Sequence, residues 1–427
     1  MQNIYRGNLV YTPTPEQFVT VERGVLAVED GKVRYAGPAD GCPAECLRWD
    51  ETDYGHRLLI PGFVDLHLHA PQFRNMGLGT DMQLLPWLET YTFPEEARFA
   101  DTAYGERIYK ALINRLWEEG TTRSVLFASI HLESTRLLAD LMIRSGLSAY
   151  VGKVNMDRNA PDYYIEDTRQ SLKDTEAFIL EYLDRSPLVK PIVTPRFVPS
   201  CTSELMEGLG KLADRYNVPV QSHLDENPAE IDWVCQLHPE SENYCGVYNQ
   251  YDLLGSQPTV MAHCIYCTGD ELALIRENRV TAVHCPHSNA NIISGIMPVK
   301  DYMDQGIRVG LGSDISGGHE LAMPRVMVLA MQLSKILAVF RDDKSRFLST
   351  AEAFYLGTKA GGSFFGQVGS FEEGYEADFL VINDDPVLRE GRSLEERISQ
   401  YLYLGTAANI EDRYVAGNKI TKPFDSL

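Results

Sequence analysis

Short apolar runs recur along the middle of this chain and alternate with stretches of helical periodicity. Runs of about four to eight residues are typical of buried strands, whereas apolar positions spaced three and four apart indicate amphipathic helices. The strand-like runs are residues 63–68, 124–127, 149–154, 191–194, 219–223, 259–263, 280–284 and 308–311. The helical patterns between and after them are 104–120, 134–146, 174–186, 203–217, 229–239, 268–279 and 297–306.

This alternation predicts an α/β fold, a (β/α)8 TIM barrel, because eight strands separated by helices can close into one cylinder. An open parallel sheet would contain similar short runs, so the number of strands decides between the two. Two further helical regions, 324–340 and 350–359, are expected outside or behind the barrel. The loop 70–99 follows the first strand and is rich in Gly, Pro and aromatic residues, so we expect it to shape an active site.

Both ends of the chain have a different pattern, in which apolar residues alternate with polar and turn residues. Asp30-Gly31 is a hairpin signal between two strand-like runs. The same alternation of apolar with polar and turn residues returns after Gly369. We therefore predict a small β-sandwich domain built from residues 1–60 together with 369–427. Residues 61–368 would form the barrel domain between these two segments.

The charge balance narrows the range of partners. The chain carries 39 Lys and Arg against 60 Asp and Glu, a net charge of −21, which disfavours nucleic acid and anionic membranes. Its first residues lack a basic start followed by an apolar run, and no stretch of eighteen apolar residues occurs in the sequence. The expected location is the cytoplasm.

The 8 cysteines are expected to be free thiols, since disulfides are rare in proteins of that compartment. Cys264 and Cys267 have the spacing of a redox or zinc pair. No second pair lies at zinc-finger spacing, so structural thiols are favoured.

Histidines and an aspartate stand where the predicted strands end. His67 and His69 are two residues apart, so on a strand both imidazoles point to the same face, whereas a helix would separate them by about 200°. His223 and His263 end two later strands, and Asp314 follows the last one. Because the carboxyl ends of barrel strands meet at the reactive face, we predict that these five residues form one metal site.

Imidazoles with one carboxylate suit a borderline-soft divalent cation, zinc first and iron second, with a position left for water. A binuclear site would normally bring a bridging carboxylated lysine at the fourth strand. That strand reads KPIVTPRF, with Lys190 before it and Arg196 after it, which favours one ion per chain.

Several side chains near the ligands could move protons. Glu226 lies three residues beyond His223, where it could lean over a bound water, and Asp225 competes with it on spacing alone. Asp314 would keep a carboxylate beside the nucleophile and could also accept the proton. His284 ends the seventh strand and is expected behind the ligands or facing substrate, with plain packing as the alternative.

The motifs PGFVDLHLH, SHLDEN, AHC, HCPHSN and GLGSD, in this order, resemble the cyclic deaminase branch of the amidohydrolase superfamily. The resemblance extends over nearly the whole chain. Further stretches are similar to the guanine deaminase family of that branch, namely HAPQF, LLPWLETYTFPEEARF, KPIVTPRF, SENY, YNQYDLL and QYLYLGTAANIEDRYVAGNKI.

The resemblance implies hydrolytic deamination of guanine to xanthine and ammonia by a homodimer. It implies zinc bound by His67, His69, His223 and Asp314. His263 would complete this set or lie beside it, bonded to the attacking water. Glu226 would be the proton shuttle.

The residue types fit a purine pocket. Gln72, three residues past His69, has an amide that can donate and accept at once. Arg196 is a planar fork suited to the carbonyl oxygen and N7 of guanine. Trp87, Phe93 and Phe197 can form flat walls. Ordinary core packing is the alternative for each aromatic, and it is the favoured one for Trp87 and Phe93.

Three other functions fit part of these observations. A different enzyme of the same branch, a deaminase or chlorohydrolase, would act on a modified purine, a pterin or a triazine. A non-catalytic barrel scaffold would have lost its ligands, and the retained ligand set with Glu226 argues against that. A metal-storage or sensor module would bind metal without turnover.

Overall fold

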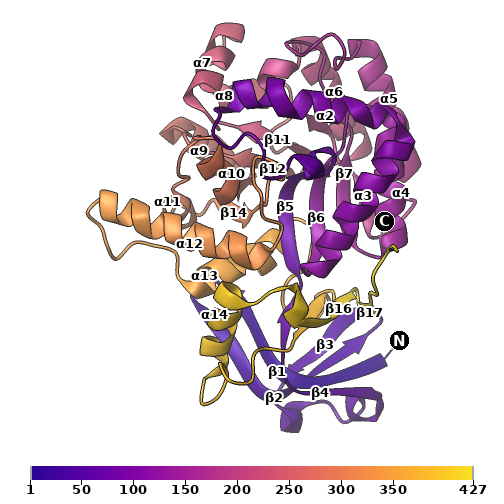
Figure 1. Cartoon of the computed structure of the whole chain (residues 1–427), viewed down its shortest axis with the longest axis vertical. Coiled ribbons are helices and arrows are strands. Elements are labelled where there is room, and N and C mark those ends of the chain that lie inside the picture. The colour runs from indigo at the N-terminus through magenta and orange to yellow at the C-terminus, as the bar shows by residue number, and fades with distance from the viewer. Residues whose placement is uncertain (1, 426–427) are drawn as a thin grey trace.

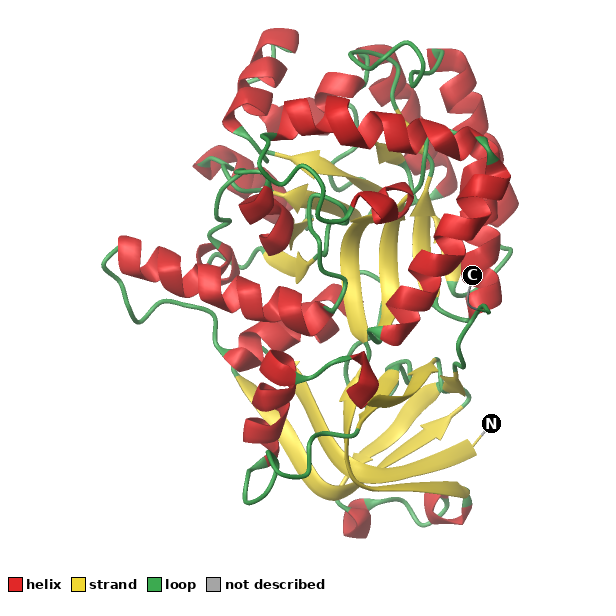
Figure 2. Cartoon of the chain, viewed as in Figure 1, coloured by secondary structure: helices red, strands yellow, loops and turns green. Residues whose placement is uncertain are grey.

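The structure is a computed structural model that describes residues 2–425. Figure 1 shows a layer of parallel strands surrounded by helices, with a separate strand-rich part below it that contains the amino-terminal strands and late carboxyl-terminal ones. Figure 2 shows that nearly all helices belong to the first part.

The strand-rich part is one seven-stranded sheet with the order β17-β16-β15-β4-β1-β2-β3. Its strands are β1 (Gln2–Thr14), β2 (Gln17–Glu29), β3 (Lys32–Gly37), β4 (Asp50–Pro61), β15 (Phe379–Ile382), β16 (Ile410–Val415) and β17 (Asn418–Lys419). Strands from both ends of the chain therefore build this sheet. Its two-layer sandwich form stays a prediction, as do the exact domain limits.

The Asp30-Gly31 hairpin is confirmed. Glu29 pairs with Lys32, and the two residues between them have φ values of 49° and 81°, the left-handed region that a tight hairpin needs. The aromatic rings of Phe379 and Tyr414 stack 4.1 Å apart in the core of this sheet.

The helix-rich part contains two parallel four-stranded sheets and a short parallel pair. The first sheet has the order β5 (Phe63–His69), β6 (Thr121–Phe127), β7 (Ser148–Gly152) and β9 (Val189–Pro191). The second has the order β11 (Val220–Leu224), β12 (Thr259–His263), β13 (Thr281–His284) and β14 (Arg308–Leu311). The pair is β8 (Val154–Asn155) with β10 (Thr194–Pro195). All eight predicted strand positions are thus occupied by parallel strands.

Backbone contacts connect the two four-stranded sheets at both margins. On one side Val193 bridges Val220. On the other, the N–H of Asp314 donates to the carbonyl of His67 at 2.8 Å, and the N–H of His69 donates to Ile315 at 2.9 Å. Closure into one continuous barrel stays a prediction.

The third and fourth predicted strands are each broken in two, as β7 with β8 and β9 with β10. The fourth contains Pro191 and Pro195, which have no N–H to donate, so its hydrogen-bond ladder is interrupted.

Helices fill the connections between strands and follow the last one. The α-helices over four residues long among the described residues are α2 (Phe93–Ala97), α3 (Thr102–Glu118), α4 (Leu132–Ser145), α5 (Thr168–Tyr182), α6 (Ser203–Tyr216), α7 (Pro228–Leu237), α8 (Tyr244–Gln250), α9 (Gly269–Glu277), α10 (Pro286–Asn291), α11 (Val299–Asp304), α12 (Met323–Phe340), α13 (Thr350–Tyr355) and α14 (Leu394–Leu404). Helix α5 begins earlier than the pattern predicts because the side chain of Asp167 caps it by accepting from the N–H of Gln170.

Among the described residues, α12 is the one helix long and apolar enough to cross a membrane by length and composition. A helix that packs in a protein core meets the same criterion. Here α12 packs against α14, α13 and α10.

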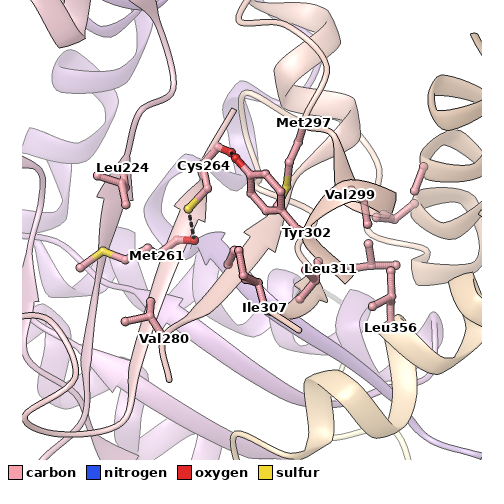
Figure 3. Close-up of a cluster of buried hydrophobic side chains, with 14 of the residues drawn as sticks. Leu224, Met261, Cys264, Val280, Met297, Val299, Tyr302, Ile307, Leu311 and Leu356 are labelled. Atoms are coloured by element: carbon pink, nitrogen blue, oxygen red, sulfur yellow. Dashed lines mark hydrogen bonds between the residues drawn. The ribbon is translucent and has the colours of Figure 1, made fainter. Parts of the chain in front are cut away.

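A large apolar cluster lies behind strands β11 to β14 (Figure 3). In it the hydroxyl of Tyr302 donates to the carbonyl of Cys264 at 2.8 Å. The cysteines, all of which lie among the described residues, are free thiols, as expected. Most are buried, whereas Cys235 is exposed and Cys267 is half-buried.

Candidate active site

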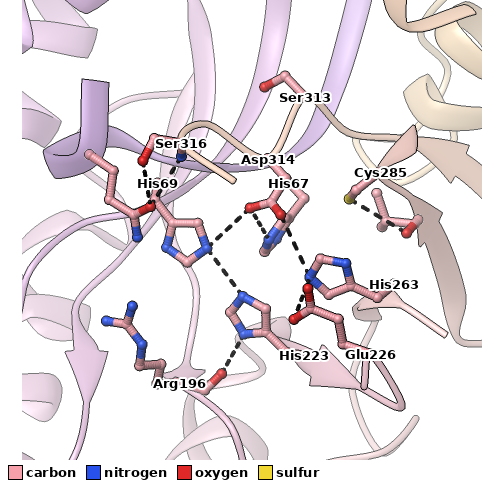
Figure 4. A network of polar contacts seen from close by, with 12 residues as sticks. His67, His69, Arg196, His223, Glu226, His263, Cys285, Ser313, Asp314 and Ser316 are labelled. Atoms are coloured by element: carbon pink, nitrogen blue, oxygen red, sulfur yellow. Dashed lines mark hydrogen bonds and ion pairs between the residues drawn. The ribbon is translucent and has the colours of Figure 1, made fainter. Parts of the chain in front are cut away.

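The structure brings the five predicted metal ligands together. His67 and His69 leave the end of β5, His223 and His263 come from β11 and β12, and Asp314 follows β14 (Figure 4). Nε2 of His67 lies 3.2 Å from Oδ1 of Asp314, and Nε2 of His263 lies 3.7 Å from Oδ2 of the same carboxylate. The Nε2 atoms of His69 and His223 lie 3.1 Å apart. All five side chains are buried.

These donors fit a divalent cation. Within the described part of the chain, Nε2 of His67 and Nε2 of His263 are buried and have no hydrogen-bond partner of good geometry, despite the nearby carboxylate. One ligand atom each from His67, His223 and His263 lies within 4.8 Å of the others, and the same holds for His67, His69 and Asp314. Converging imidazole nitrogens with one carboxylate oxygen are the donors that zinc prefers.

The pKa values of three of the predicted ligands are shifted toward the deprotonated form that binds a cation. Burial, together with the neighbouring imidazoles, lowers the pKa of His69 and of His223 well below the usual range, so both rings are neutral. Burial by itself raises the pKa of Asp314, but His67, His263 and His69 outweigh it and hold this pKa well below its usual range. Metal ligands must be deprotonated, and these groups are so at neutral pH.

Backbone and side-chain oxygens fix the imidazole rings from behind. Nδ1 of His223 donates to the carbonyl of Arg196 at 2.6 Å, and Nδ1 of His263 lies 2.9 Å from Oδ1 of Asn289. The hydroxyl of Tyr248 donates to the carbonyl of His223 at 2.9 Å. Such partners orient the ligand rings and leave the Nε2 lone pairs facing the cation position.

Two of these supports were not found in the sequence. Asn289 stands in the HCPHSN motif without any spacing that singles it out. Tyr248 lies on α8, in a segment for which the sequence predicted no site residue.

Spacing in the sequence left both Asp225 and Glu226 as candidates for the proton shuttle, and the structure distinguishes them. Glu226 lines the cavity beside the metal ligands, with Oε2 at 3.3 Å from Nε2 of His263 and Oε1 accepting from the hydroxyl of Ser294 at 3.0 Å. Asp225 is absent from the described residues that line the cavity. Its φ of 49° turns the backbone at this point, which sends successive side chains in different directions.

Burial raises the pKa of Glu226 to about 7, with Glu230 and Asp314 adding to the effect and His263 opposing it. A group of that pKa can both accept and release a proton near neutral pH. The carboxylate of Glu230 also accepts from the N–H of Glu226 at 3.1 Å, which fixes the backbone at this residue.

Four of the five predicted ligands, His69, His223, His263 and Asp314, line a pocket of about 420 Å³, a volume that includes space open to solvent. Of the predicted substrate-binding residues, Gln72, Trp87, Arg196 and Phe197 line it. The remaining lining residues besides the predicted ligands and Glu226 are Leu84, Leu88, Ser288, Ile292 and Gly317. Phe93 and His284 are not among the described lining residues; Phe93 lies beneath Arg196, with its ring centre 5.2 Å from the guanidinium carbon. Burial lowers the pKa of His284 to about 3, so this imidazole is neutral behind the site.

A carboxylate that the sequence analysis missed joins the two polar residues of the cavity. Arg196 donates from Nη1 to Oε2 of Glu96 at 2.5 Å and from Nη2 to Oε1 at 3.2 Å. Nε2 of Gln72 donates to the same Oε1 at 2.7 Å, and Oε1 of Gln72 accepts from the N–H of Ser316 at 3.1 Å. Glu96 is one of two adjacent acids on α2, and no pattern in the sequence distinguishes them.

Comparisons with known proteins identify the family of this chain. The Amidohydrolase family profile matches residues 58–420. Guanine deaminase of Dictyostelium discoideum is 41% identical over 379 residues, which cover 86% of this chain and 83% of that protein. Human guanine deaminase is 36% identical, and the match covers 100% of this chain and 98% of that protein.

A crystal structure of guanine deaminase from C. acetobutylicum with guanine bound in its active site superposes with a TM-score of 0.97. The two chains are 50% identical, and the match covers 99% of this chain and 100% of the other. The resemblance inferred from the motifs is confirmed. The chain therefore belongs to the amidohydrolase family and, within it, to the family that contains these guanine deaminases.

Proposed function

We propose that this protein hydrolyses guanine to xanthine and ammonia with one divalent cation per chain. The observation that carries the proposal is the pairing, in one buried cavity, of a converging His and Asp group with a polar cluster suited to a purine. The similar C. acetobutylicum enzyme, whose active site holds guanine, supports the same substrate.

His67, His69, His223 and Asp314 would hold the ion, with His263 completing the set. Zinc suits these nitrogen and oxygen donors best, and iron is the alternative. A bound zinc ion supplies Lewis acidity, which makes water a strong nucleophile near neutral pH.

Glu226 moves the protons of the reaction. Its carboxylate takes a proton from the water whose oxygen bonds to C2 of guanine. It then delivers a proton to the exocyclic nitrogen as the bond from C2 to that nitrogen breaks, and ammonia leaves. The carboxylate of Asp314 is a second group that could accept the proton of the water. Its Oδ2 lies 3.7 Å from Nε2 of His263.

The other end of the cavity binds the purine. Arg196 would donate to the carbonyl oxygen and N7 of guanine, and the amide of Gln72 to the opposite edge. Trp87 and Phe197 would flank the ring. These two polar groups recognise atoms that a triazine or a simple pyrimidine does not present in the same positions.

The proposal extends to the architecture. The eight parallel strands would close into a TIM barrel over residues 61–368, with a β-sandwich from residues 1–60 and 369–427. The contacts at both sheet margins support closure. A cytoplasmic homodimer completes the proposal, in line with the family resemblance and the acidic charge balance.

The direct test combines elemental analysis with an ultraviolet assay of guanine conversion on one preparation. About one zinc or iron per chain and formation of xanthine and ammonia are expected. Metal-loaded protein that leaves the guanine spectrum unchanged would refute the proposal. A parallel panel of a pterin, a triazine and modified purines identifies the substrate if guanine fails.

A further inference from the structure

Glu96 holds the substrate-facing residues in place. It lies on α2, in the long loop after β5, and its side chain is fully buried. One carboxylate oxygen accepts from both Gln72 and Arg196, and the other accepts from Arg196 alone. The side chain of Glu96 therefore connects α2 to Gln72, which follows β5, and to Arg196, which follows β10.

The remaining hydrogen bonds of Gln72 fix which atoms of its amide face the cavity. Its Oε1 accepts from both the N–H and the hydroxyl of Ser316, at 3.1 and 3.3 Å. The amide oxygen and one amide hydrogen are thus occupied, so the second hydrogen on Nε2 is the group left to face a ligand. Without Glu96 the amide could turn over and present either end.

Glu96 also sets the charge of this end of the cavity. The Arg196 guanidinium is buried and always protonated, and the bidentate carboxylate cancels its charge. Two of the five N–H groups of Arg196 are used in that pair, and the others stay available to a neutral acceptor. An unpaired buried guanidinium would instead attract an anion.

We propose that Glu96 is a positioning and specificity residue, which orients Gln72 and Arg196 and makes the cavity select a neutral purine over an anionic one. The inference rests on the proposed function, because guanine is neutral near physiological pH whereas xanthine loses a ring proton more readily. Glu96 then lowers affinity for the anionic form of the product and favours its release.

The test compares Glu96→Gln with Glu95→Gln. Glu95 is the preceding residue on α2 and is also mostly buried, but it binds Arg98 and Tyr104 and lies outside the cavity lining. Both substitutions remove one buried acid from the same helix. We would measure kcat and KM for guanine, the inhibition constant of xanthine at mildly alkaline pH, and bound metal.

We expect Glu96→Gln to keep its metal and to raise KM for guanine by up to about 100-fold. The ratio of the xanthine inhibition constant to KM for guanine should fall by about tenfold. Glu95→Gln should leave both quantities near the parent values. An unchanged ratio in Glu96→Gln, or equal changes in the two variants, would overturn the inference.

Glu96→Asp provides a second variant in case the first does not fold. It keeps the negative charge but is one methylene shorter, so KM for guanine should rise. The ratio of the xanthine inhibition constant to KM should stay at the parent value. A parent-like KM in this variant would refute the positioning role. A parent protein without guanine turnover would instead refute the proposed function, so the two failures are distinct.

Discussion

The main-chain carbonyl of Arg196 accepts a 2.6 Å hydrogen bond from Nδ1 of His223, while the guanidinium of Arg196 points into the cavity. One residue thereby serves both ends of the site. Its main chain fixes the tautomer of His223, which we propose as a metal ligand, and its side chain lines the cavity that we propose for the substrate. The two roles can be separated, because a side-chain substitution leaves the carbonyl in place.

Arg196→Ala should therefore retain metal but lose guanine turnover. We expect kcat/KM to fall by at least about 10²-fold, since a site built to hydrogen-bond its substrate loses its donors. The buried Glu96 loses its cationic partner and keeps the hydrogen bond from Gln72, and this loss costs about 3–5 kcal/mol of stability. Elemental analysis and steady-state kinetics on folded protein check this, with Arg196→Lys as the variant that keeps the charge. Loss of metal along with activity would contradict the separation of roles.

Glu226→Gln and Asp225→Asn should behave differently although the residues are adjacent. The first removes the proton shuttle, so kcat should fall by about 10²- to 10⁴-fold with little change in metal content. The second replaces a carboxyl that is outside the cavity lining and whose pKa burial raises to about 8, so a neutral amide resembles its protonated form. Its kcat should stay within a few-fold of the parent. Equal losses in the two variants would show that the pair acts through the local backbone.

Asn289→Ala tests whether His263 binds the metal. The substitution removes the oxygen that lies 2.9 Å from Nδ1 of His263. If His263 is a ligand, as we expect, metal affinity should fall by about 10- to 100-fold. Competition with a chromogenic chelator measures this affinity. An unchanged affinity with a lower kcat would show instead that His263 orients the water.

A buried ion pair links the seven-stranded sheet to β6 of the helix-rich part. Arg123 on β6 donates from Nε to Asp378 at 2.6 Å, and both side chains are buried. Arg123→Leu should cost about 3–5 kcal/mol of unfolding free energy, because Asp378 is left without its cation. The exposed pair of Arg23 with Asp53 is the control, where Arg23→Ala should cost less than about 1 kcal/mol. Urea unfolding followed by circular dichroism compares the two, and similar losses would count against the link.

Features that have a regular position in the fold can be predicted from the sequence. The His and Asp residues at strand ends, the parallel strands and the Asp30-Gly31 turn follow from periodicity and spacing. Glu96 could not be found in this way, because nothing in the sequence of its loop shows which of two neighbouring acids turns inward. Tyr248 and Asn289 act through a carbonyl and a ring nitrogen of other residues, and such contacts exist only after folding. The early start of α5 was missed because its first turns are polar.

The hydrogen bonds that join β5 to the chain after β14 also bear on how the protein folds. Ser313 and Asp65, which bond beside the ligands, are 248 residues apart in sequence. Contacts of such separation carry a high loop-closure entropy and tend to form late. Tight metal binding should therefore report that the whole domain has assembled, and fragments ending before residue 314 should be unable to acquire it. Metal uptake would mark the completion of folding during synthesis, when Asp314 comes into contact with His67.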